Sequence, residues 1–289
     1  MAIGRYGALL DAVRGVRWPA RRAVPGGAPG AHQARTRGIA PEFAEYRPYR
    51  QGDDPRRVDW KLLARSDRAY IRLAPDRAVL GTTMVVDASA SMAYPAEGRN
   101  KWSLAREVAV ALAAVAHASA DPVGLVVMHA GGMTALRPRT RRGVLAEMAL
   151  TLDGISPAGA LPLHPALSHV RGRLVIITDC LGDLAAMRRA AHALAAQGGE
   201  VTVVHIVARL EVDPPAGALL AIDPEVPAVV RSLTDGGRVG YSERFAAWRT
   251  QVARGWRDDG VSYVEARDDE LAERVVRRVV HAAQRVAGA

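Results

Sequence analysis

One aspartate and two serines stand at alternating positions at the end of a short apolar run, as Asp87, Ser89 and Ser91. The carboxylate supplies an anionic oxygen, and two hydroxyls two residues apart in a turn can face the same point. Hard cations such as Mg²⁺ take oxygen ligands of this kind and keep some of their waters. The pattern therefore predicts a magnesium site, although the same side chains could instead satisfy backbone N–H groups in a turn or cap the next helix.

A second aspartate, Asp179, follows another uninterrupted apolar run at residues 173–178. Parallel strands end at the same edge of a sheet, and ligands of open α/β sheets bind beyond that edge at a switch point of the topology. We therefore expect Asp87 and Asp179 to converge there, with Asp179 holding the cation through water. A cluster that binds no metal and is held together by hydrogen bonds remains the alternative.

From residue 82 onward, apolar runs alternate with helical periodicity, which predicts an α/β fold with a mostly parallel sheet between two helix layers. The expected strands are 82–87, 122–129, 173–178, 200–207 and 261–266. The expected helices are 102–118, 140–152, 163–170, 184–197, 242–257 and 268–285. The pair Gly131-Gly132 predicts a hairpin between 123–130 and 133–138, so one edge of the sheet should be antiparallel.

The first 37 residues have a different character, with a predicted basic helix at 3–18 and a Gly/Pro-rich linker at 24–31. Residues 1–80 contain 16 basic and 8 acidic side chains, which accounts for most of the net charge of +9. Only two aromatic residues, Tyr6 and Trp18, lie among the arginines of residues 1–37, so few side chains could stack on nucleic-acid bases. Binding of nucleic acid or of a membrane surface through this arm is an alternative function, but the scarcity of aromatics disfavours nucleic acid and any membrane contact should be peripheral. A helix that docks on a protein partner is at least as well supported.

Composition limits the class of protein and its compartment. A chain of 289 residues with 49% hydrophobic content can bury a full core. No run approaches the roughly 20 apolar residues that cross a bilayer, and the N-terminus has no signal core. The single cysteine, Cys180, fits a reducing compartment. The expected location is therefore cytoplasmic.

A charged block at residues 47–65 has the spacing R-x-Y-x-x-G-D-D-x-R-x-V-D-W-x-x-x-A-R. It resembles the signature of the bacterial domain-of-unknown-function fifty-eight family, which has Ile where this chain has Val58. The resemblance continues through Asp87–Ser91, the strand before Asp179 and residues 241–265. The signature positions are Arg47, Tyr49, Gly52, Asp53, Asp54, Arg56, Asp59, Trp60 and Arg65.

That resemblance implies a three-layer, Rossmann-like von Willebrand factor A-type domain at 81–289, preceded by a signature segment at 38–80 packed on it and an N-terminal arm at 1–37. Genes of the family commonly accompany a MoxR-type AAA+ ATPase, which implies a non-catalytic adaptor in chaperone-like assembly, with this ATPase and a client protein as partners. Asp87, Ser89, Ser91 and Asp179 then correspond to a metal-ion-dependent adhesion site that an acidic residue of the partner completes. Many relatives have N-terminal membrane helices, so this chain should be the short, soluble form.

One position departs from a complete adhesion site. A threonine is usual in a Gly-Thr-x-Leu context, whereas this chain has Ala160 between Gly159 and Leu161. The loss of one ligand out of about six should weaken Mg²⁺ binding, unless water or Ser156 fills the gap.

The signature block has a physical interpretation of its own. Its interleaved arginines and carboxylates predict a network of bidentate ion pairs. Gly52 permits a turn, and Trp60 is large enough to anchor the segment on the main domain. We expect a structural clasp in preference to a direct contact with a partner.

An enzyme is the alternative from another class. Asp87 could be a phosphoryl-accepting nucleophile and Asp179 a magnesium ligand, as in haloacid-dehalogenase-like phosphatases. That chemistry requires an aspartate two residues on, where this chain has Ser89, and a lysine on a later loop, whereas both lysines lie at or before Lys101. The sequence therefore predicts no catalytic residues.

Overall fold

The protein is described by a computed structural model that covers residues 2–20, 29–33, 45–50, 53, 58–73, 77–168, 170–217, 219–226 and 228–285. Two compact units are present. The larger, which we call the A-type unit, comprises Met1–Trp18 and Gly81–Ala289, and the smaller, the signature unit, comprises Pro19–Leu80. This division differs from the expected one, because the first 18 residues belong with the larger unit.

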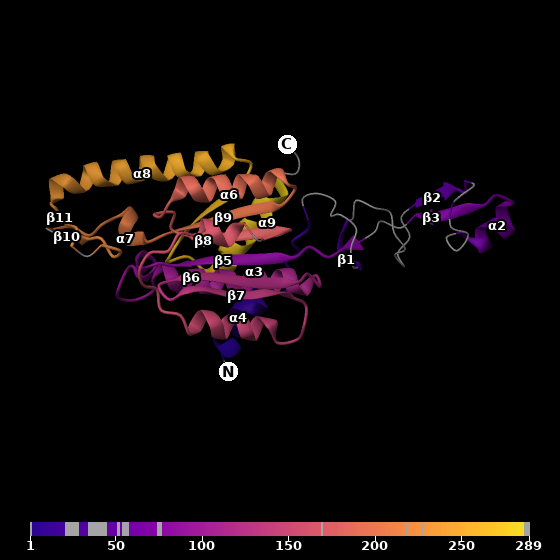
Figure 1. The fold of residues 1–289 in the computed structure, drawn as a ribbon, viewed down its shortest axis with the longest axis horizontal. Helices are drawn as coiled ribbons and strands as arrows, with labels where there is room; N and C mark the ends of the chain where they lie inside the picture. Colours follow the sequence, from indigo (N-terminus) through magenta and orange to yellow (C-terminus); the bar gives the residue numbers. More distant parts are fainter. Residues whose placement is uncertain are drawn as a thin grey trace. The chain divides into compact units, whose positions relative to one another are not determined.

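A six-stranded sheet forms the centre of the A-type unit (Figure 1). Its strands are β5 (Thr82–Ala88), β6 (Val123–His129), β7 (Gly132–Arg139), β8 (Arg173–Thr178), β9 (Glu200–Val207) and β12 (Ser262–Arg267). They lie in the order β12-β9-β8-β5-β6-β7, and every pair is parallel except the β6–β7 hairpin. The predicted parallel sheet with one antiparallel edge is therefore confirmed.

Helices cover both faces of this sheet, as Figure 1 shows for α6 and α8 on one side and α3 and α4 on the other. Strand β5 illustrates why, since Met84 and Val86 enter one hydrophobic cluster and Val85 enters the other. The first cluster contains residues of α3 (Lys101–Ala118), α4 (Val144–Asp153) and α9 (Ala272–Arg285). The second contains residues of α5 (His164–Leu167), α6 (Leu184–Ala196) and α8 (Asp235–Asp258). The result is the predicted three-layer α/β architecture.

The N-terminal residues 2–18 form part of the core of the A-type unit. They contain a 3₁₀ turn, η1 (Ala2–Tyr6), and a short helix, α1 (Gly7–Ala12), so the helix ends earlier than the predicted 18. Tyr6, Val13 and Trp18 are buried in the cluster of α3, α4 and α9. The expectation of a basic arm is therefore wrong for this stretch, because its buried apolar side chains make it part of the hydrophobic core.

Among its described residues, the signature unit contains two short antiparallel ladders and one helix. Strand β1 (Pro29–Gln33) pairs with β4 (Arg77–Ala78), which replaces part of the expected linker, and β2 (Glu45–Pro48) pairs with β3 (Tyr70–Leu73). Helix α2 (Trp60–Ser66) completes this unit. Its small apolar cluster consists of Val58, Ile71 and Leu63.

Four elements of the A-type unit have no counterpart in the sequence-based expectations: the turn η3 (Ala90–Ala93), the short helix α7 (Arg209–Val212) and the two strands of a hairpin, β10 (Leu219–Ile222) and β11 (Val230–Leu233). Helix α8 also begins seven residues before the expected 242. Among the described residues, no helix combines the length and the apolar character needed to cross a membrane.

Candidate functional site

The candidate site lies where the direction of the sheet reverses. From β5 the chain crosses to β6 on one side, while β8 lies on the other side of β5 and continues outward to β9. Asp87 is the penultimate residue of β5, and Asp179 directly follows β8. Neighbouring strands that lead to opposite sides leave a crevice beyond their carboxyl ends, which is the usual ligand position in such sheets.

The carboxylate of Asp87 ties the ends of the two central strands together. Its Oδ2 accepts a hydrogen bond from Thr178 Oγ1 at 2.7 Å, and its Oδ1 accepts one from the backbone N–H of Ser89 at 2.9 Å. Burial raises the pKa of Asp87 to about 6, and the negative charge of Asp179 contributes to the rise while these hydrogen bonds oppose it. The two predicted carboxylates therefore lie within electrostatic reach of one another.

The two predicted hydroxyls also face each other. Ser89 Oγ and Ser91 Oγ are 3.1 Å apart, and Ser91 Oγ donates to Glu225 Oε1 at 3.2 Å. Oxygens at adjacent corners of an octahedron with magnesium bonds of about 2.1 Å are about 3.0 Å apart. The spacing of these oxygens is therefore compatible with neighbouring positions around a small hard cation.

Glu225 was not among the predicted site residues. It lies in the turn of the β10–β11 hairpin, 134 positions from Ser91. Burial raises the pKa of Glu225, and the hydrogen bond from Ser91 opposes that rise. The hairpin had no recognisable sequence pattern, so no local signal placed this carboxylate at the site.

Asp179 faces a buried lysine. Its Oδ2 accepts from Lys101 Nζ at 2.8 Å, and its Oδ1 accepts from the backbone N–H of Leu181 at 3.2 Å. Lys101 Nζ also donates to Glu211 Oε1 at 2.7 Å. Burial lowers the pKa of Lys101, but the charges of Asp179 and Glu211 outweigh that effect and raise it. The charge of Asp179 is thus already compensated by a protein cation, and its role as a water-mediated metal ligand stays a prediction.

Lys101 is the second site residue that the sequence analysis missed. The phosphatase pattern requires a lysine on a later loop, whereas Lys101 begins α3, the helix that follows β5. A crossover helix starts at the same edge at which its preceding strand ends, so its first turn returns to that edge. The position of Lys101 one residue after the helix cap Asn100 was therefore an available signal.

Ala160 lies at the site, as expected for the missing threonine. Its loop is held beside the Asp87–Ser91 turn, because Ala90 N donates to Gly159 O at 2.8 Å. Ala160 lines a hollow of about 290 Å³ together with Asp87, Ser89 and Glu225. The loop of Gly159 and Ala160 therefore borders the hollow, and Ala160 brings no side-chain oxygen to it.

The donor chemistry around this hollow fits Mg²⁺. Hard oxygens come from the carboxylates of Asp87 and Glu225 and from the hydroxyls of Ser89 and Ser91, which is the ligand class that this cation prefers. Within the described part of the chain, no group of three or more His, Cys, Asp or Glu side chains is arranged to hold a metal ion. Any cation bound here would therefore depend on the serine hydroxyls.

The signature residues belong to the signature unit. Arg47 Nη2 contacts Asp53 Oδ1 at 2.8 Å, and Asp59 caps α2 by accepting from the N–H groups of Lys61 and Leu62. Tyr49 and Arg65 are exposed, as is Trp60 at 62%. Anchoring by Trp60 therefore stays a prediction. Gly52, Asp54 and Arg56 lie outside the described residues.

Comparison with known proteins places this architecture in a family. A family described as "Protein of unknown function DUF58" matches residues 45–251. Two similar relatives are "Uncharacterized protein Rv1480" of Mycobacterium tuberculosis and "Uncharacterized protein Mb1516" of Mycobacterium bovis. Each is 30% identical over 273 residues, which cover 90% of this chain and 85% of the relative.

Solved structures with a similar fold have low sequence identity. BatB of Bacteroides thetaiotaomicron is 18% identical, with a TM-score of 0.46 over 73% of this chain and 100% of that one. The SpRpn10 VWA domain is 13% identical, with a TM-score of 0.41 over 69% of this chain and 95% of that one. The strand order and the two helix layers described above form a three-layer α/β fold with a mostly parallel sheet and one antiparallel edge strand. With the family match over residues 45–251, the chain belongs to the DUF58 family.

Proposed function

We propose that this protein is a non-catalytic adaptor that binds other proteins through the carboxyl edge of its A-type sheet. The supporting observation is a hollow at the switch point of the sheet that Asp87, Ser89 and Glu225 line, with the Ser91 hydroxyl in hydrogen-bond contact with Ser89 and Glu225. We further propose that it works with a MoxR-type AAA+ ATPase in the assembly of a client protein. This second part rests on the family resemblance alone.

In this proposal Asp87, Ser89 and Ser91 hold Mg²⁺. One carboxylate and two neutral hydroxyls leave a bound divalent cation with net positive charge, so that it attracts an acidic group of the partner. Glu225 already presents a carboxylate to Ser91 from the tip of a hairpin. We infer that Glu225 marks the place of the partner's carboxylate and is displaced when the partner binds.

A magnesium-dependent phosphatase is the competing function, and the site favours it less. Ser89 stands where an acid/base aspartate would be needed, and its hydroxyl contacts Ser91. Lys101 is fully buried between Asp179 and Glu211, so its ammonium is already committed to two carboxylates. Neither residue is free to support phosphoryl transfer to Asp87.

The test is capture of a purified MoxR-type ATPase by the full chain in Mg²⁺ and in EDTA, alongside calorimetric titration with MgCl₂. Asp87→Asn should abolish both Mg²⁺ binding and capture. The matched control is Asp183→Asn, because Asp183 lines the same hollow and caps α6, and asparagine caps a helix as well as aspartate does. Glu225→Gln should strengthen capture.

Two results would contradict the proposal. Capture that is unchanged in Asp87→Asn would remove the metal bridge from the mechanism. Release of phosphate from p-nitrophenyl phosphate that is lost in Asp87→Asn would instead identify the protein as a hydrolase.

A further inference from the structure

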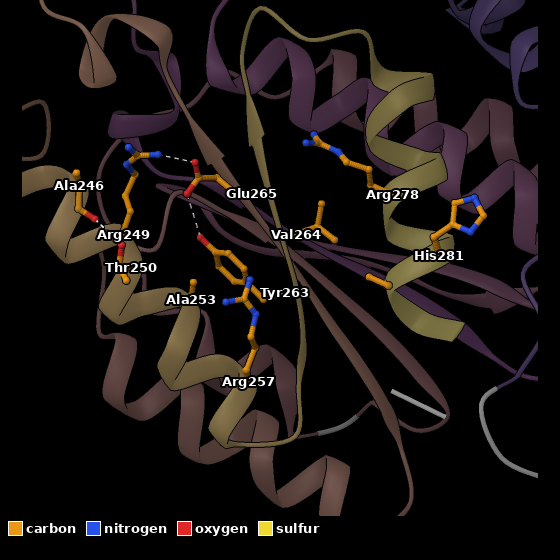
Figure 2. A pocket seen from close by; sticks show the side chains of 11 residues that line it. Ala246, Arg249, Thr250, Ala253, Arg257, Tyr263, Val264, Glu265, Arg278 and His281 are labelled. Atoms are coloured by element: carbon orange, nitrogen blue, oxygen red, sulfur yellow. Dashed lines mark hydrogen bonds and ion pairs between the residues drawn. The ribbon is translucent and has the colours of Figure 1, made fainter. Parts of the chain in front are cut away.

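A groove of about 850 Å³ runs along the open edge of β12, well apart in sheet order from the Asp87 site (Figure 2). Strand β12 is the terminal strand of the sheet and is paired with β9 on one side. Helix α8 supplies one wall of the groove and α9 the other. The floor of the groove is therefore the backbone and side chains of an edge strand.

Hydrogen bonds at the end of β12 show which backbone groups face the groove. Asp268 N donates inward to Val207 O of β9, whereas Arg267 N donates to the side chain of Glu270. Because successive residues of a strand point their N–H and C=O groups to opposite sides, Tyr263 and Glu265 direct theirs away from β9. These groups form a template for one more strand, as sheet edges commonly do.

Basic side chains dominate the walls. Arg249 and Arg257 come from α8, and Arg278 and His281 come from α9, while Glu265 is the acidic residue of the lining. In Figure 2, Arg249 reaches Glu265. The remaining lining offers no carboxylate to Arg257, whose guanidinium lies 5.4 Å from the centre of the Tyr263 ring. Arg249 is paired with Glu265, and Arg278 is paired with Glu270 outside the lining, so the excess of positive charge that a ligand meets comes from Arg257.

We propose that this groove binds an extended acidic segment of a partner protein, which adds to β12 as a seventh strand. Backbone hydrogen bonds to Tyr263 and Glu265 supply affinity, and acidic side chains on alternate positions reach the arginines on either wall. Small wall residues, including Ala246, Ala253 and Ala282, leave room for the added chain. A second copy of this protein fits poorly, since it would place the same arginines opposite each other.

The test uses the full chain and a fluorescein-labelled octapeptide that alternates aspartate and valine. Fluorescence anisotropy should show saturable binding below about 1 mM. Replacing the aspartates by lysine should weaken binding at least about tenfold through like-charge repulsion. Methylating alternate backbone nitrogens should weaken it similarly, because a methylated amide cannot donate to β12.

A matched pair of variants on α8 separates the groove from general electrostatics. Arg257→Glu should weaken peptide binding about tenfold or more, by placing a repelling charge in the groove. Arg254→Glu changes the same charge on the same helix, but Arg254 does not line the groove and its side chain is 83% exposed. This control should bind the peptide like the unmodified protein.

Four results would overturn the proposal. Undiminished binding of the methylated peptide would indicate ion pairing without strand addition, and equal losses in the two variants would indicate diffuse attraction. Absence of saturable binding up to about 1 mM would remove the site. A concentration-dependent dimer, detected by sedimentation and abolished by Arg257→Glu, would assign the groove to a second copy of the chain.

Discussion

Replacement of the buried lysine tests the electrostatic structure of the site most directly. Lys101 is fully buried, and its partners Asp179 and Glu211 are 3% and 18% exposed. Lys101→Met keeps a side chain of similar length but removes the ammonium. Two neighbouring carboxylates are then left without their shared cation. Removing one partner of a buried ion pair typically costs about 3–5 kcal/mol of folding free energy.

The expected result is a fall of about 3–5 kcal/mol in the free energy of unfolding at pH 7, measured by urea denaturation. The loss should shrink as the pH is lowered. Burial already raises the pKa of Glu211, and the charge of Lys101 opposes that rise. Without Lys101 the pKa of Glu211 rises further, so protonation relieves the repulsion at a higher pH.

The control is the triple variant Lys101→Met, Asp179→Asn, Glu211→Gln. Both amides keep an oxygen that can accept the hydrogen bonds from the backbone N–H groups of Leu181 and Ala208, as the carboxylates do in the native protein. The triple variant should therefore recover most of the lost stability, because no buried charge remains. The reasoning is refuted if Lys101→Met changes stability by less than about 1 kcal/mol, or if the triple variant is as unstable as the single one.

The remaining predictions concern Asp87 and Trp18. The pKa of Asp87 is raised to about 6 in the folded protein, against an ordinary value of 3.8. The protonated carboxyl therefore stabilises the folded state at low pH, and about 3 kcal/mol of this stability is lost as the pH rises from about 4 through 6. In EDTA, Asp87→Asn should raise the free energy of unfolding at pH 7 by up to this amount and flatten the pH profile; an unchanged profile would contradict the assignment. Trp18 is buried, with the Arg173 guanidinium 4.2 Å from its ring centre, so Trp18→Ala should lower stability by about 3–5 kcal/mol in thermal unfolding. Its exposed neighbour Arg17 provides the control, since Arg17→Ala should change stability little. A loss of less than about 1 kcal/mol in Trp18→Ala would show that the segment does not belong to the core.

The central strands were predicted nearly to the residue. Strands β8 and β9 match the expected 173–178 and 200–207, and β5 extends one residue beyond the expected end. These strands are buried on both faces, so their apolar runs are continuous and recognisable. Helix α8 was harder to delimit, because its glycine-containing first turns carry little apolar periodicity.

The candidate site was predicted in part. Asp87, Ser89 and Ser91 form a local pattern in one turn, and Asp179 follows an evident strand. Their convergence was expected from the rule that parallel strands end at one edge. The N-terminal segment was predicted wrongly. Its arginine content suggested a separate arm, whereas the side chains of Tyr6, Val13 and Trp18 are buried in the core.

Short-range patterns along the chain were enough to predict the family, the order of the central strands and the four oxygen-bearing residues at their ends. The pairing of the charges could not be predicted in this way, because it depends on the folded arrangement. Lys101 meets Asp179 across 78 positions, and Ser91 meets Glu225 across 134. Contacts of that separation depend on how the layers and the hairpin pack, and packing leaves no periodic trace in the neighbouring residues.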